Sequence, residues 1–176
     1  KTRMVNAGVR IELKKILDIE LEYYDNVTSD MLSKIYVSRV LSSDRISSNI
    51  GRMRNTGIEL SLSSTNFARR NFTWTTNFNM AHNSNKILEL YNGVPTSFGS
   101  YAWMEGYDSQ TWNLVRWAGV DPSDGSPMWY DKDGNITRTF STANRVPYKT
   151  KTPLLSGGLV NNLSWKNWTF SFQINY

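Results

Sequence analysis

The sequence contains no cysteine and only one histidine, His82, among its 176 residues. Without cysteine there can be no disulfide bond, thiolate metal ligand or cysteine nucleophile. A lone histidine supports neither a zinc site nor a directed serine-histidine-aspartate triad. We therefore expect a protein that is not an enzyme and has no catalytic residue, bound metal or cofactor.

Long apolar runs are also missing, and basic residues do not cluster. No stretch of about 20 apolar residues occurs, which excludes a transmembrane helix. Strands of a membrane β-barrel escape this test because they alternate polar and apolar residues. The net charge of +5 comes from 20 dispersed Lys and Arg residues among 15 Asp and Glu residues. A nucleic-acid interface would gather basic residues on one face, so we expect no nucleic-acid partner.

Alternation of apolar and polar residues is the dominant pattern, and it predicts antiparallel β-strands. It is clearest near the C-terminus, where Trp168, Phe170 and Phe172 alternate with polar residues. It is least regular at Asn161, which falls on the apolar face of its strand. The predicted strands cover residues 4–14, 17–27, 54–65, 72–82, 154–165 and 168–176.

The two predicted faces differ in charge. Apart from Asp25 and Arg54, which lie near the ends of their strands, no charged residue falls on an apolar face. This fits a lipid-facing sheet, because a Lys or Arg facing lipid at mid-bilayer costs roughly 2–4 kcal/mol. A soluble β-sandwich also has one polar and one apolar face, so the pattern alone leaves that alternative open. The opposite faces carry residues that would face a barrel lumen, namely Arg10, Glu12, Glu20, Glu22 and Glu59.

The connections between the predicted strands alternate in length. Residues 15–16, 66–71 and 166–167 form short connections, whereas 28–53 and 83–153 are long. Outer-membrane barrels have short periplasmic turns and long extracellular loops, but a loop of about 70 residues is unusual in a compact soluble domain. We predict an all-β fold, an antiparallel up-and-down meander that forms part of a transmembrane β-barrel with long extracellular loops. Six strands are too few to close such a barrel, so only part of its wall is expected.

Aromatic residues flank the short connections. Trp165 and Trp168 enclose one turn, and Phe72 and Trp74 follow another. Aromatic rings are favoured at membrane–water boundaries, so we expect these rings at the inner boundary.

The long segment 83–153 contains the candidate binding residues. Aromatic rings suit stacking on sugars, and the polar side chains around them suit hydroxyl groups. The alternative is that these rings pack the core of the loop or contact a lid protein. We favour Trp103, Trp112 and Trp117, because Trp129 would lie in a hairpin. The candidates are Tyr101, Trp103, Trp112, Trp117 and Trp129.

The run Asp131–Asn135 has two possible interpretations. It begins like a calcium-binding EF-hand loop, but Thr142 stands where the bidentate Glu belongs. A β-hairpin that turns at Asp133 and Gly134 explains the run better, and a weak calcium site in the loop stays open.

Four segments carry longer motifs. NIGRMRNTGIELSLSS (49–64) has the pattern N-x-G-x-x-x-N-x-G-x-E, and FTWTTNFNMAHNSNKILEL (72–90) has N-x-N-K-[IV] near its end. WAGVDPSDGSPMWYDKDGN (117–135) has G-V-D-P-x-x-G-x-P-x-[YW]-x-D-x-x-G. TPLLSGGLVNNLSWKNWTFSF (152–172) has P-x-x-x-G-G-L-x-N-x-[FL]-S-[YW]-K-x-[FW]. In this order the segments resemble the SusC/RagA-type TonB-dependent transporters. Leu154 departs from the family pattern, in which a Lys would follow the proline.

This resemblance implies the C-terminal part of an outer-membrane barrel that imports oligosaccharides, or sometimes peptides, into Bacteroidetes-like bacteria. It also implies a SusD-like surface lipoprotein as a lid, contact with outer-membrane lipid, and energy from the TonB complex through a plug domain. No segment resembles a plug domain or TonB box, so we expect a fragment of the barrel. The alternative function is a soluble β-sandwich carbohydrate-binding module.

Overall fold

The computed structural model describes residues 1–36, 45–49 and 51–176. Within these ranges the chain forms β-strands and two short 3-10 helices, and no α-helix. None of the helices in this part of the chain is long and apolar enough to cross a membrane. The strands belong to two compact units. The sheet unit comprises Lys1–Met31, Met53–Asn85 and Pro153–Tyr176, and the loop unit comprises Leu32–Arg52 and Lys86–Thr152.

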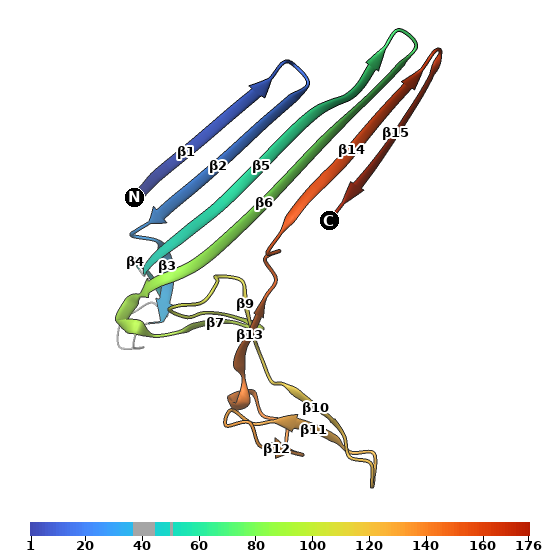
Figure 1. The fold of residues 1–176 in the computed structure, drawn as a ribbon. Coiled ribbons are helices and arrows are strands. Elements are labelled where there is room, and N and C mark those ends of the chain that lie inside the picture. The colour runs from blue at the N-terminus through green and yellow to red at the C-terminus, as the bar shows by residue number, and fades with distance from the viewer. Residues whose placement is uncertain (37–44, 50) are drawn as a thin grey trace. The chain divides into compact units, whose positions relative to one another are not determined.

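The sheet unit is built on one six-stranded antiparallel sheet with the order β1-β2-β5-β6-β14-β15 (Figure 1). Each strand pairs with the next one along the chain within this set, and the three short turns lie at the same end of the sheet (Figure 1). The predicted all-β antiparallel meander is therefore confirmed. The strands are β1 (Thr2–Leu13), β2 (Leu17–Thr28), β5 (Gly51–Arg69), β6 (Phe72–Leu90), β14 (Ser156–Trp165) and β15 (Trp168–Asn175).

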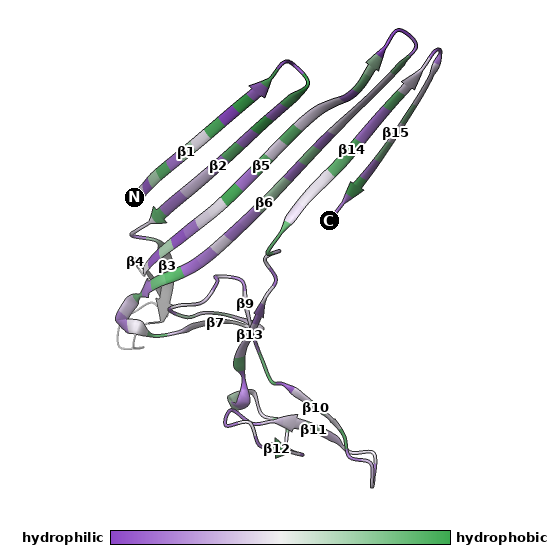
Figure 2. Ribbon diagram, in the orientation of Figure 1, coloured by the Kyte–Doolittle hydropathy of each residue, from purple (hydrophilic) through white to green (hydrophobic). Residues whose placement is uncertain are grey.

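The strand register places apolar residues beside apolar ones across the sheet. Leu21 of β2 pairs with Val9 of β1 and Leu60 of β5, whereas the next residue, Glu22, pairs with Glu59. Since successive side chains of a strand point to opposite faces, this register produces one apolar and one polar face. The alternating colours along the strands show the same period of two (Figure 2).

The apolar face of the sheet is largely uncovered. Val9, Phe170 and Trp168 are 61%, 63% and 77% exposed. A soluble sheet would bury such a face against a second layer. Among the described residues, the buried hydrophobic ones are Val27, Ile87, Leu90 and Ala102, and of these only Val27 belongs to the sheet unit. The sheet therefore depends on a surrounding apolar medium or on further protein.

Asn161 shows how a polar residue is accommodated on the apolar face. It is only 6% exposed, and its side-chain oxygen accepts hydrogen bonds from the Trp74 indole (2.9 Å) and the Thr76 hydroxyl (2.7 Å). The Thr76 oxygen in turn accepts a bond from the Asn66 amide (2.6 Å). Buried polar groups are tolerated when they are paired in this way. The network explains the irregularity in the sequence pattern.

The structure corrects the predicted bounds of the strands and loops. β6 continues to Leu90, beyond the predicted range 72–82, and β5 begins at Gly51 rather than at 54. The added stretch of β6 has polar residues on both faces, so it lacks the alternation that marked the rest. The predicted loop 28–53 contains the hairpin β3–β4, while its residues 37–44 and 50 lie outside the described residues.

The predicted long loop 83–153, for which the sequence indicated one hairpin, contains small antiparallel sheets. One sheet has the order β13-β9-β8-β7 and another β10-β11-β12. A short core holds Ile87, Leu90 and Ala102, which are 0%, 4% and 2% exposed. The bounds are β3 (Leu32–Tyr36), β4 (Arg45–Asn49), β7 (Thr96–Phe98), β8 (Tyr101–Trp103), β9 (Thr111–Leu114), β10 (Trp117–Val120), β11 (Pro127–Tyr130), β12 (Ile136–Thr137) and β13 (Val146–Thr150), with 3-10 helices η1 (Tyr91–Gly93) and η2 (Thr142–Asn144).

Backbone hydrogen bonds hold this core together. The Ile87 amide donates to the Tyr107 carbonyl and the Gly106 amide donates to the Ile87 carbonyl, both at 2.8 Å. The Glu105 carboxylate accepts the amide of Leu90 at 2.9 Å. These contacts fix residues 86–90 against 105–107 and give the strands of the loop unit an anchor.

Candidate functional site

The first aromatic cluster of the loop unit, here the Tyr101 cluster, consists of Tyr101, Trp112 and Lys151. Tyr101 of β8 pairs with Trp112 of β9, and their rings stack with centroids 4.3 Å apart at 27°. The Lys151 ammonium lies 4.9 Å from the Tyr101 ring centroid. Both rings are half-buried. This cluster joins an aromatic face to a cation, an arrangement that also stabilises the sheet itself.

The second aromatic cluster, here the Trp129 cluster, consists of Trp117, Trp129 and Phe140. Trp117 of β10 pairs with Trp129 of β11, with ring centroids 5.9 Å apart and planes at 81°. Phe140 meets Trp129 edge-on at 5.5 Å. Trp117 and Phe140 are each 56% exposed. The cluster is therefore a preorganised aromatic surface that is open to solvent, the kind of surface that binds sugar rings or apolar side chains.

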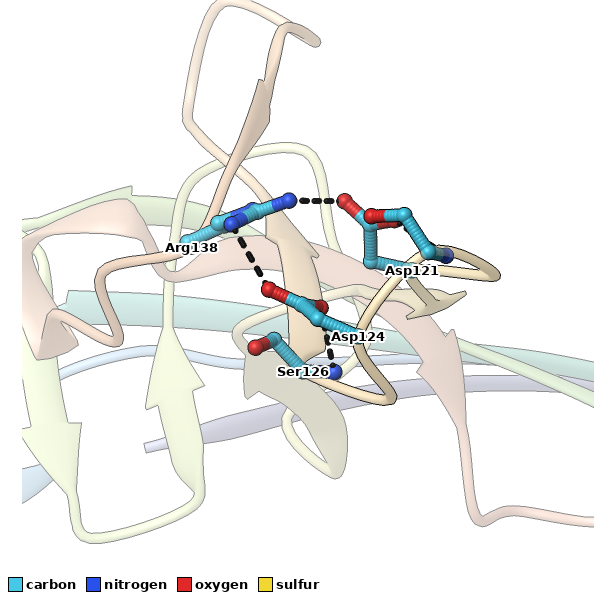
Figure 3. A network of polar contacts seen from close by, with 5 residues as sticks. Asp121, Asp124, Ser126 and Arg138 are labelled. Atoms are coloured by element: carbon cyan, nitrogen blue, oxygen red, sulfur yellow. Dashed lines mark hydrogen bonds and ion pairs between the residues drawn. The ribbon is translucent and has the colours of Figure 1, made fainter.

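A polar network of Asp121, Asp124 and Arg138 lies in the segment that contains the Trp129 cluster (Figure 3). Arg138 donates to both carboxylates, at 3.0 Å in the case of Asp124. The backbone amide of Ser126 donates to Asp124 (2.9 Å), and the amide and hydroxyl of Ser123 donate to Asp121 (2.9 and 2.6 Å). The turn between β10 and β11 is thereby tied to the chain two residues before Phe140.

These contacts also perturb the acidity of the two carboxyl groups. The hydrogen bonds from Ser123 and then from Arg138 lower the pKa of Asp121 to about 2. The backbone amide of Ser126, together with weaker contacts, lowers the pKa of Asp124. Both groups are therefore ionised at neutral pH and act as acceptors that shape the turn, and neither is poised to donate a proton.

The predicted hairpin at Asp131–Asn135 is confirmed. β11 and β12 pair with Tyr130 opposite Ile136. One oxygen of Asp131 accepts the amides of Asp133 (2.9 Å) and Asn135 (2.8 Å), and the other oxygen accepts the Asn135 side chain (3.2 Å). The amide of Asn135 is the main cause of the lowered pKa of Asp131. The carboxylate is thus engaged in closing the turn.

The structure groups four of the five candidate rings in two pairs. Tyr101 joins Trp112, and Trp117 joins Trp129, so Trp129 is not separated from the others by its hairpin. Trp103 is half-buried on β8 opposite Thr96. Sequence reasoning did not select Phe140 or Lys151, because both lie outside the short alternating runs and meet the rings only through the tertiary fold.

The only histidine is engaged in the sheet unit. Nδ1 of His82 lies 2.5 Å from the carbonyl oxygen of Leu154, to which it donates. This contact ties β6 to the segment that leads into β14. His82 lies within β6, which continues beyond it to Leu90.

Comparison with known proteins yields relatives of one kind. "TonB-dependent receptor P39" of Formosa agariphila is 32% identical over 107 residues, which are 60% of this chain and 10% of the relative. "TonB-dependent receptor P3" of the same species is 27% identical over 94% of this chain and 19% of its own length. "TonB-dependent receptor SusC" of Bacteroides thetaiotaomicron is 24% identical over 99% of the chain and 19% of its own length. No family model matches the chain.

Solved structures match the fold along nearly the whole chain. The RagAB peptide transporter gives a TM-score of 0.88 at 24% identity and covers 99% of this chain and 20% of its own. The RagAB peptide importer in its "open-open" state gives 0.91 at 24% identity over the same shares. In its "closed-closed" state the importer is 26% identical, with a TM-score of 0.87, over 99% of this chain and 21% of its own.

The chain thus spans about a tenth to a fifth of the length of the relatives it matches. The matches in sequence and in fold extend over nearly the whole of this chain. In sequence and fold the chain therefore matches part of the TonB-dependent receptors of the SusC/RagA type.

Proposed function

We propose that the chain forms part of the wall and the extracellular loops of an outer-membrane transporter that imports oligosaccharides or peptides. The observation that carries this proposal is the uncovered apolar face of the sheet, with Phe170 and Trp168 63% and 77% exposed. Strands β14 and β15 contain 10 and 8 residues, close to the 9–11 that a barrel strand needs to cross a bilayer. Lipid would cover the apolar face, and further strands would continue the sheet at both edges.

The polar face of the sheet would line the lumen. Arg10 and Asp18 form an ion pair across β1 and β2 at 2.6 Å, and Glu22 and Glu59 are direct neighbours across β2 and β5. Such a face is hydrated in an open barrel, or it packs against a plug that fills it. The plug would also provide contact with the TonB complex.

The loop unit would meet the substrate or a lid. One solved neighbour is named a peptide transporter, which supports a peptide substrate, and the family resemblance adds oligosaccharides as the second substrate class. We propose that the exposed rings of the Trp129 cluster contact substrate, with Tyr101, Trp103 and Trp112 in supporting positions. A SusD-like lipoprotein would then close over this surface.

The alternative, a soluble β-sandwich carbohydrate-binding module, requires that the apolar face of the sheet be covered by protein. It requires a second sheet over the apolar face, where Val9 is 61% exposed. A complete receptor that fractionates with the outer membrane and shows heat-modifiable migration on a gel supports the barrel. Recovery of the folded protein from the soluble fraction without detergent would overturn it.

Substrate contact is tested with the complete receptor in cells. Trp117→Ala combined with Trp129→Ala is expected to lower uptake of its imported oligosaccharide or peptide at limiting concentration by about tenfold, because burying an aromatic anchor contributes more than about 1 kcal/mol at a binding surface. The probes are fluorescent maltoheptaose and a fluorescent mixed peptide digest. Tyr148→Ala, which removes a 57% exposed ring elsewhere in the loop unit, is the matched control and should leave uptake unchanged. Equal uptake by both variants would show that the Trp129 cluster does not contact substrate.

A further inference from the structure

The three short turns of the sheet unit share an unusual charge. Lys14 and Lys15 lie between β1 and β2, and Lys166 lies between β14 and β15. Arg69 is the last residue of β5, and Arg70 follows it in the turn to β6. All five side chains are exposed, and the turns lie at one end of the sheet (Figure 1). No acidic residue falls within residues 14–16, 69–71 or 166–167. This end of the sheet, here the basic rim, is therefore a row of cations.

The backbone indicates that these lysines are not ordinary turn residues. Lys14, Lys15 and Lys166 have φ values of 48°, 57° and 52°. This left-handed region is costly for side chains other than Gly and Asn, which normally occupy hairpin turns of this kind. A residue that does not suit the local backbone conformation marks a functional position when its side chain can bind a ligand.

An apolar groove lies beside the basic rim on the apolar face of the sheet. It has a volume of about 440 Å³ and is lined by Phe72, Leu163, Trp165, Trp168 and Phe170. Trp168 is 77% exposed and Trp165 57% exposed, so the groove is open along its length. Its lining is hydrocarbon and aromatic ring, which suits an acyl chain.

Cations bracket the groove on both sides. The Lys166 ammonium lies 5.3 Å from the Trp165 ring centroid. On the other side, the Arg69 guanidinium lies 5.7 Å from the Phe67 ring, whose centroid is 5.4 Å from that of Phe72. A molecule seated in the groove would therefore have the Lys166 and Arg69 cations available to its polar end.

We propose that the basic rim and this groove bind a phospholipid with an anionic headgroup, with phosphate at Lys166 and Arg69 and an acyl chain along Phe72, Trp165 and Trp168. The site rests on the proposed function, because the groove must face a bilayer. Charge complementarity selects the anionic lipid over a zwitterionic one, since each cation near an anionic membrane surface strengthens binding about fivefold. An acidic protein would neutralise the cations of the basic rim but would not place an acyl chain in the groove.

The test uses the complete receptor that contains this chain, purified in detergent and mixed with equal amounts of phosphatidylglycerol and phosphatidylethanolamine. Native mass spectrometry measures the ratio of the two lipids that stay bound. Lys15→Gln, Arg69→Gln and Lys166→Gln together are expected to lower the bound phosphatidylglycerol ratio at least about fivefold. The matched control neutralises three exposed cations of the loop unit, Lys86, Lys132 and Lys149, and should change the ratio less than twofold.

Two further variants separate the headgroup from the acyl chain. Lys166→Arg keeps the charge and should keep the ratio, whereas Trp168→Ala should lower total retained lipid of both kinds. An unchanged ratio in the triple Gln variant, with the receptor folded and inserted, would overturn the lipid site while leaving the barrel proposal intact. Failure of the unmodified receptor to insert into vesicles of any composition would overturn both proposals.

Discussion

In the sheet unit the apolar face stands uncovered, whereas the loop unit has a small buried core beside its exposed rings. Trp168 and Val9 are 77% and 61% exposed, but Ile87 and Ala102 are 0% and 2% exposed. Backbone hydrogen bonds between long strands hold the sheet unit together. The loop unit is held by a small core and by turns in which a carboxylate accepts backbone amides. The difference indicates that the sheet unit is built for an apolar medium and the loop unit for water.

The largest expected effect comes from a charge in the middle of the apolar face. Phe172 lies at the centre of the run Trp168–Tyr176, and its neighbour Gln173 points to the polar face. Phe172→Lys should lower the free energy of unfolding of the complete receptor in vesicles by about 2–4 kcal/mol, measured by urea titration. Gln173→Lys is the control and should cost far less. Equal losses at both positions would remove the distinction between a lipid face and a lumen face.

A second prediction concerns close packing on the polar face. A Cβ atom at Gly57 would fall against the Tyr24 ring and 2.6 Å from the backbone oxygen of His82. Gly57→Ala should therefore cost about 1–3 kcal/mol of stability, because the backbone as well as the ring must shift. Gly8→Ala is the control, since its Cβ would meet only the flexible Glu22 side chain at 3.4 Å. Urea titration of both variants in vesicles measures the contrast, and a Gly57→Ala variant as stable as Gly8→Ala would contradict it.

The hydrogen-bond network on the apolar face supplies a third prediction. Asn161→Ala leaves the Trp74 indole and Thr76 hydroxyl without their shared acceptor, which should cost about 1–3 kcal/mol in an apolar environment. Trp74→Phe removes one of the stranded donors, so the double variant should lose less than the sum of the two single losses. Strict additivity in this cycle would show that water, and not lipid, surrounds the network.

The smallest expected effect concerns the acid-sensitive turn of the loop unit. The pKa of Asp121 is lowered from 3.8 to about 2, so its contribution to stability is complete above about pH 4 and is lost as the pH falls toward 2. Amide hydrogen exchange in residues 117–138 should accelerate over this interval.

Arg138→Gln should give part of this acceleration already at neutral pH, because it removes the cation shared by Asp121 and Asp124. Arg145→Gln is the control, since Arg145 donates to the Gly99 carbonyl outside this turn. Identical exchange in both variants would show that the network does not hold the hairpin.

Much of the sheet could be predicted from the sequence, because its alternation is a local property. Runs such as Trp168–Tyr176 reveal both their strand and their faces without any tertiary information. The extension of β6 to Leu90 could not be predicted in this way. Its polar residues face water or protein on both sides, so hydrophobic patterning carries no signal there.

The candidate site was predicted less completely. The aromatic residues were found by composition, and four of the five candidates do form ring pairs. Their partners Phe140 and Lys151 were missed, because a contact between short strands depends on how turns such as 121–126 fold back. Whether these rings bind substrate is a property of the assembled receptor and stays a prediction.

The sequence by itself determined the strands, their two faces and the family resemblance, because alternation and motif spacing are written in neighbouring residues. Only the tertiary structure decided which aromatic rings meet, how Asn161 is satisfied on an apolar face, and that the basic turns lie beside an apolar groove. These features join residues far apart in the chain, such as Thr76 and Asn161, or Arg69 and Lys166. Strand register brings such residues together, and register is settled by the packing of the whole sheet.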